Sequence, residues 1–216
     1  MLHFKFLGFP VTIHWMFWVV SALLGSISVT GSQSPGILIL MWMGVVFVSI
    51  LIHELGHTLF QRKLLHAYPR ILLHGMGGLA IPEGGRRATR GQQIVISFMG
   101  PLFGLAVGLL TWRYAVHFPP ESPMVWSLIR MILWVNIGWS VINLFPVLPL
   151  DGGRVMEAVI GGRNPRLPYQ VSMVVAVLIA VLAVVMTGRY FLAMWFGFFA
   201  YENYQRSKGL ATTGFF

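Results

Sequence analysis

The sequence predicts an all-α polytopic membrane protein: a six-span helical bundle with a small re-entrant β-hairpin between the second and third spans. Apolar residues make up 56% of the 216 residues and charged residues only 10%, which is far from the balance of a soluble domain. Several apolar runs approach the roughly 20 helical residues that cross a bilayer. A polar, glycine-rich stretch separates the second run from the third, and it is the candidate hairpin.

The apolar runs give the expected spans in chain order. The first run has the look of a signal peptide, but its length and the lack of a small-x-small cleavage site favour a retained span. The last run is the shortest and carries Glu202 close to its end. The expected spans cover residues 11–29, 37–60, 94–112, 125–145, 169–186 and 190–204.

Two stretches interrupt the helices. Residues 64–93 are too polar and too rich in glycine for a helix in lipid, and residues 70–81 alternate in a way that predicts a hairpin. Non-helical backbone at membrane depth needs cover by protein or access to water, and an ordinary cytoplasmic loop is the alternative. In residues 143–153, Pro146 and Pro149 break the fourth helix. Without a linker or an internal repeat, we expect one domain over residues 1–216.

The net charge of +9 indicates membrane topology rather than a nucleic-acid partner. Most lysines and arginines fall in connections that lie on one side of the membrane when both termini are cytoplasmic, as the positive-inside rule requires. A nucleic-acid surface would need aromatic residues among the basic ones, and this pattern is missing. We therefore expect a multi-pass protein in contact with lipid, and no nucleic acid.

The second span carries the motif His53-Glu54-Leu55-Gly56-His57. Residues four apart share one face of a helix, so the two imidazoles can bind one metal ion. Glu54 lies about 100° round the helix and can accept a proton from a metal-activated water. Ionisable side chains within a span are costly and usually functional. The alternative is that neighbouring polar groups satisfy both histidines and that Glu54 is paired or protonated.

A catalytic zinc site normally has three protein ligands and one open position. The chain has no cysteine, and the metzincin pattern is excluded because Lys63 stands where its third histidine would be. Asp151 is the only aspartate, and it lies in the proline-rich break, followed by two glycines that allow close helix approach. It is our candidate third ligand. A helix N-cap or a partner for Arg154 is its alternative role, and Glu157 is the alternative ligand.

These motifs resemble those of the site-2 protease family of intramembrane zinc metalloproteases, in its short form without a PDZ or CBS domain. The matching stretches are the His53–His57 motif and residues 143–153, with weaker similarity at residues 97–101 and 8–15. The resemblance implies one Zn²⁺ per chain, bound by His53, His57 and Asp151. It also implies Glu54 as the general base and Asn143 as an active-site residue that orients the substrate or stabilises the oxyanion.

The resemblance further implies an endopeptidase that cuts in or near a transmembrane segment of a single-span or otherwise membrane-associated protein, in the membrane of a bacterial or archaeal cell. The oligomeric state stays open. One rival is a metal transporter, which would have no need of Glu54 and usually shows repeats. Another is a scaffold with structural zinc, which usually uses thiolates. We expect the lone His14 to make an interhelical hydrogen bond or to gate the site.

Overall fold

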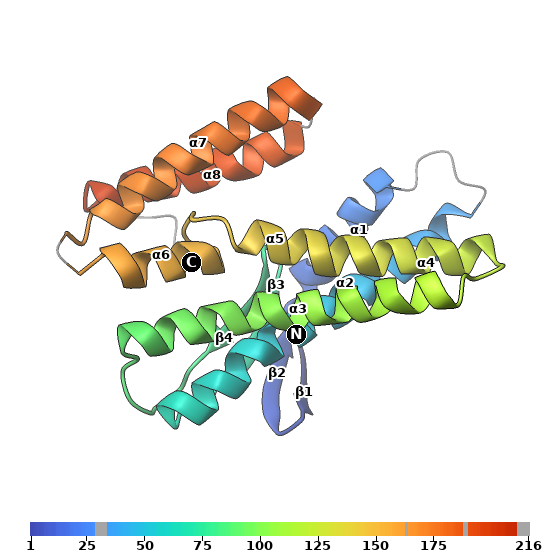
Figure 1. The fold of residues 1–216 in the computed structure, drawn as a ribbon, viewed down its shortest axis with the longest axis horizontal. Coiled ribbons are helices and arrows are strands. Elements are labelled where there is room, and N and C mark those ends of the chain that lie inside the picture. The colour runs from blue at the N-terminus through green and yellow to red at the C-terminus, as the bar shows by residue number, and fades with distance from the viewer. Residues whose placement is uncertain (29–33, 163, 188–189, 211–216) are drawn as a thin grey trace. The chain divides into compact units, whose positions relative to one another are not determined.

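The computed structural model describes the chain except residues 29–33, 163, 188–189 and 211–216 (Figure 1). The chain divides into two compact units, residues 1–88 with 99–141, and residues 89–98 with 142–216. Helix α3 (Arg90–His117) contributes its first residues to the second unit and the rest to the first. The single domain over residues 1–216 stays a prediction.

A four-stranded sheet of order β1-β2-β3-β4 lies in the first unit. The neighbouring strands pair antiparallel, parallel and antiparallel in that order. The predicted hairpin is confirmed: its two strands are β3 and β4, and they keep to residues 70–81. The strands are β1 (Leu2–Phe6), β2 (Phe9–Ile13), β3 (Arg70–His74) and β4 (Gly77–Ile81).

Strands β1 and β2 were not predicted, and they correct the expected first span at residues 11–29. Strand β2 buries Phe9, Val11 and Ile13 in alternation, which is the period of a strand with one covered face. Gly8, at φ +84°, turns the chain between β1 and β2. The helix α1 (Trp15–Ser28) that follows has 14 described residues, against the roughly 20 that cross a bilayer. Val29, the expected end of this span, lies outside the described residues.

Among the described residues, four helical stretches are long and apolar enough to cross a membrane, so the count of six spans is not confirmed. The third stretch runs without interruption through α4, a π-helical turn η1 and α5. The four stretches are α2 (Pro35–Leu65), α3, Pro123–Asn143 and Leu167–Met186. The parts of the third are α4 (Pro123–Leu133), η1 (Trp134–Gly138) and α5 (Trp139–Asn143).

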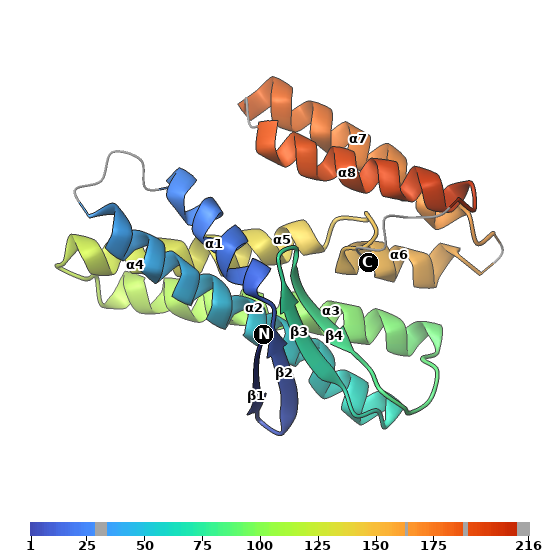
Figure 2. The same cartoon turned by 180° about the vertical axis from the view of Figure 1, so that it is seen from behind.

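The core of the first unit joins the sheet to helices α1 and α2. The inward side chains of β2 and β3 are almost fully buried, and they pack against Phe17 of α1 and Val46 of α2. Figure 2 shows β3 and β4 beside α2, and both strands contact this helix. Because α2 carries the histidine motif, this packing holds the sheet next to the site.

The second unit contains α6 (Asp151–Ile160), α7 (Leu167–Thr187) and α8 (Tyr190–Ser207). Helices α7 and α8 lie side by side as a helical hairpin (Figure 1). The predicted break over residues 143–153 is confirmed, since α5 ends at Asn143 and α6 begins at Asp151. Helix α8, the expected sixth span, has 18 residues and is not among the candidate spans. Its buried Glu202 and Asn203 lower its hydropathy.

Candidate active site

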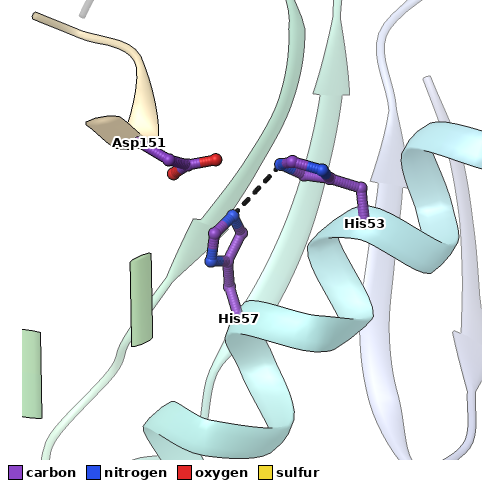
Figure 3. Close-up of side chains that lie close together, drawn as sticks. All are labelled: His53, His57 and Asp151. Atoms are coloured by element: carbon purple, nitrogen blue, oxygen red, sulfur yellow. Dashed lines mark hydrogen bonds between the residues drawn. The ribbon is translucent and has the colours of Figure 1, made fainter. Parts of the chain in front are cut away.

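His53 and His57 lie one turn apart on α2, with their ring nitrogens facing each other. The two Nε2 atoms are 3.2 Å apart (Figure 3). Both side chains are buried, at 4% and 7% exposure. Zn–N bonds of 2.0–2.1 Å in a tetrahedral site place two nitrogen ligands about 3.3 Å from each other. The histidine pair therefore already has the separation of two ligands on one zinc ion.

Gly100 of α3 lies directly against the Nε2 atoms of the two histidines. A Cβ atom at this position would overlap the Nε2 atoms of both His53 and His57. Helices α2 and α3 also touch at Gly56, where a Cβ would overlap the backbone carbonyl of Met99. The two glycines let α2 and α3 approach closely at the histidine pair, where residue 100 has no side chain to stand against the nitrogens.

Glu54, between the two histidines, is buried at 4% exposure. A buried carboxyl group is expensive, and within a membrane span it indicates function. Its side chain lies against Gly78 of β4, where a Cβ would overlap it. The hairpin thus touches the proposed general base directly.

In the second unit, Asn143 ends α5 and Asp151 begins α6, and both side chains are buried. Leu150 occupies the N-cap position and Asp151 is the first helical residue, so the alternative role of Asp151 as an N-cap is wrong. Glu157, the alternative third ligand, is exposed. Burial thus favours Asp151 over Glu157 as a metal ligand.

Two further buried polar residues of the first unit, Ser49 and Asn136, lie near the histidine pair in the chain fold. The Asn136 amide in η1 donates a hydrogen bond of 2.8 Å to the Ser49 hydroxyl of α2. Ser49 lies four residues before His53, on the same helix face, and this spacing could have identified it. A π-helical turn inside an α-helix often marks a functional site. The hydrogen bond ties α2 to the neighbouring span one turn from the histidine pair.

His14 lies in the turn between β2 and α1, so it is not within a span. Its backbone N–H donates to the Leu73 carbonyl at 2.8 Å, and its Nδ1 accepts a hydrogen bond from the Met16 N–H at 3.3 Å. These bonds fasten the start of α1 to β3. The bond to Leu73 joins the turn to the sheet and the bond from Met16 fixes the turn itself, so neither is the interhelical bond that we expected.

Comparison with known sequences relates the chain to zinc metalloproteases. Residues 119–187 match the family model of Peptidase family M50. The chain is 25% identical over 160 residues to "Zinc metalloprotease MJ0392" of Methanocaldococcus jannaschii, covering 73% of this chain and 44% of that protein. It is 32% identical over 129 residues to "Putative zinc metalloprotease sll0528" of Synechocystis, covering 59% of this chain and 33% of that protein. The chain thus spans less than half the length of these relatives.

Comparison with solved structures defines the fold class. The chain matches the Site-2 Protease from Methanocaldococcus jannaschii with a TM-score of 0.64 at 23% identity, over 100% of this chain and 99% of that one. The protein is therefore a polytopic helical protein with the site-2 protease fold. Together with the match to Peptidase family M50, this confirms the resemblance to the site-2 protease family.

Proposed function

We propose that this chain is a zinc-dependent intramembrane endopeptidase that hydrolyses a peptide bond in or near a transmembrane segment of a membrane-associated protein. The observation that carries the proposal is the His53–His57 pair, whose Nε2 atoms lie 3.2 Å apart on a helix long and apolar enough to cross a membrane. Burying two imidazoles and a glutamate in such a helix costs free energy of folding, so these side chains indicate a functional site. Relatives named zinc metalloproteases support the same chemistry.

Asp151 is the proposed third ligand. Two imidazoles and one carboxylate are a donor set that zinc accepts, and three protein ligands leave a fourth position for water. In the proposed site these three buried side chains, drawn in Figure 3, would hold the metal ion. The helix N-terminus at Asp151 favours the ionised carboxylate that a metal ligand must be.

The proposed reaction divides the work among few groups. Zinc, when bound, supplies a Lewis acid that polarises the scissile carbonyl and acidifies water. Glu54 accepts the proton of the attacking water and delivers it to the leaving amine. The Asn143 amide orients the substrate or donates a hydrogen bond to the oxyanion. Burial of Glu54 keeps bulk water away from the proton that it carries.

The hairpin is the proposed substrate-binding element. Strand β4 is an edge strand, and the Ala80 carbonyl on its outer side accepts a hydrogen bond of 3.2 Å from the Gln61 side chain. Backbone groups alternate along an antiparallel strand, so Gly78, two residues earlier, faces the same outer edge. A substrate segment must unwind to expose its amides. Pairing as an added strand at Gly78 would bring it beside Glu54.

The chain is a membrane protein, and we propose that both termini are cytoplasmic in a bacterial or archaeal cell. The excess of lysine and arginine in the connections assigned to one side supports this topology. A single-span or membrane-associated protein is the proposed substrate.

The decisive experiment compares wild type with Glu54→Gln for zinc content and for cleavage of a single-span substrate in proteoliposomes. We expect about one zinc per chain in both proteins, and a loss of cleavage of about 10²–10⁴-fold in the variant, as for removal of a general base. Cleavage by Glu54→Gln at the wild-type rate would overturn the mechanism. Zinc flux through the vesicle membrane that survives Glu54→Gln would favour the transporter instead.

A further inference from the structure

The residue Leu148, three positions before Asp151, is held through both of its backbone groups by side chains of other helices. Its N–H donates a hydrogen bond of 3.0 Å to the Ser172 hydroxyl of α7. Its carbonyl accepts a hydrogen bond of 2.7 Å from the Asn203 amide of α8. Ser172 and Asn203 are buried, at 0% and 2% exposure. The α7–α8 hairpin therefore grips the chain just ahead of the proposed ligand.

This stretch needs such partners because it cannot satisfy its own backbone. Pro146 and Pro149 lack N–H groups and break the helix. Short turns satisfy some of the remaining groups: the N–H of Val147 donates to Phe145, and the N–H of Leu150 donates to Val147. Val147 and Leu148 are buried, and buried backbone groups without a partner are costly, more so in lipid.

The same stretch fixes the start of α6. A Cβ on Gly152 would overlap the Leu144 carbonyl, and a Cβ on Gly153 would overlap Val147 and Leu148. The first turn of α6 is therefore packed directly on the backbone that Ser172 and Asn203 hold. Asp151, which opens this turn, has its backbone position set by the segment on which the two glycines rest.

We propose that Ser172 and Asn203 are positioning residues for the Asp151 carboxylate, acting through Leu148. The proposal rests on the proposed function, since it takes Asp151 as a zinc ligand. The Asn203 amide also donates 2.8 Å to the Phe199 carbonyl within α8. Its Oδ1 atom is buried and makes no hydrogen bond with the described residues. Burying an oxygen without a hydrogen bond costs free energy, and a leucine at position 203 would not have that cost. The hydrogen bond to the Leu148 carbonyl therefore explains why the residue is an asparagine.

The test measures metal binding as well as turnover. Ser172→Ala removes the acceptor for the Leu148 N–H, and Ser172→Thr restores a hydroxyl. Asn203→Leu removes the donor to the Leu148 carbonyl at similar side-chain size. Ser207→Ala is the matched control in α8, because within the described part of the chain the buried Ser207 hydroxyl donates to the Tyr204 carbonyl of its own helix, at 2.7 Å. Zinc affinity is measured by chelator competition on the purified full chain, and site geometry by the visible spectrum of the cobalt(II)-substituted protein.

Ser172→Ala and Asn203→Leu should each weaken zinc binding about tenfold and shift the cobalt spectrum, as loss of an outer-shell support does. Ser172→Thr and Ser207→Ala should match wild type. If Ser172→Ala and Asn203→Leu keep the zinc affinity and cobalt spectrum of Ser207→Ala, the positioning role is wrong while the proposed function stands. If Asn203→Leu does not fold, Ser172→Ala decides by the same two measurements. Wild type that binds no zinc would overturn the proposed function itself, and the positioning role with it.

Discussion

Gly78 of β4 lies directly against the side chain of Glu54 in α2, so a single methyl group at Gly78 would overlap the proposed general base. Gly78 does not have the positive φ that Gly77 has, at +127°, and alanine fits its backbone. The proposed substrate-binding hairpin therefore contacts the proposed general base through Gly78, which has no side chain.

Gly78→Ala should lower the turnover number by about 10²-fold, the effect of misplacing a catalytic group by about an ångström. Zinc content should stay at the wild-type level, because the histidine pair is not touched. Gly44→Ala in α2, where an added Cβ meets nothing within 4 Å, is the control. Equal turnover in Gly78→Ala and Gly44→Ala would show that the hairpin does not constrain Glu54.

Gly100→Ala should prevent zinc binding, because the added Cβ would overlap the Nε2 atoms of His53 and His57. We expect zinc content well below one per chain and loss of cleavage, measured by elemental analysis and a substrate assay. Gly91→Ala in the same helix adds its Cβ to open space and should bind zinc normally. Full zinc content in Gly100→Ala would contradict the assignment of these nitrogens as ligands.

Asp151→Ala and Glu157→Ala separate the two candidate third ligands. Asp151 is buried and Glu157 is exposed, so we expect Asp151→Ala to lose zinc and Glu157→Ala to keep it. Removing one of three protein ligands should weaken binding by at least about 10–100-fold, the loss seen for supporting residues alone. The reverse result would reassign the site to Glu157.

Asn143→Ala should leave zinc content unchanged and lower the turnover number by about 10²–10³-fold, as for removal of an oxyanion donor. The Michaelis constant separates the two proposed roles. A mainly raised Michaelis constant indicates substrate orientation, and a mainly lowered turnover number indicates oxyanion stabilisation. Zinc loss in Asn143→Ala would assign it to metal binding instead.

The pKa of His74, in β3, lies below its ordinary value of 6.5, first because of burial and second because of the neighbouring His14. Its Nδ1 accepts a hydrogen bond of 3.3 Å from the Met76 N–H, which requires that nitrogen to be unprotonated. As the pH falls below 6.5, the unfolded chain takes up a proton at His74 before the folded chain does, so folding stability falls.

The unfolding temperature in detergent should therefore drop between pH 7.5 and pH 5.5, and the drop should be smaller in His74→Gln. The other histidines are shared by both proteins, so the difference between them reports His74. An identical drop in both would show that His74 does not contribute to the pH dependence.

The hairpin and the helix break were predictable because their causes are local. Residues 70–81 alternate with the period of a strand, and Pro146 and Pro149 stop a helix wherever they stand. The predicted start of the first span was wrong because it depends on pairing with a distant part of the chain. Residues 9–13 are as apolar as a membrane helix, and their pairing with β3, nearly sixty residues later, makes them a strand.

The sequence by itself determined the membrane class, the histidine pair on one helix face, and Glu54 between them, because each depends on composition or on spacing along one helix. Only the tertiary structure decided that Gly100 faces the histidine nitrogens, that Gly78 touches Glu54, and that Ser172 and Asn203 grip Leu148. Each of these contacts joins residues distant in the chain. Their proximity arises from the packing of whole helices and strands, which no local pattern of residues records.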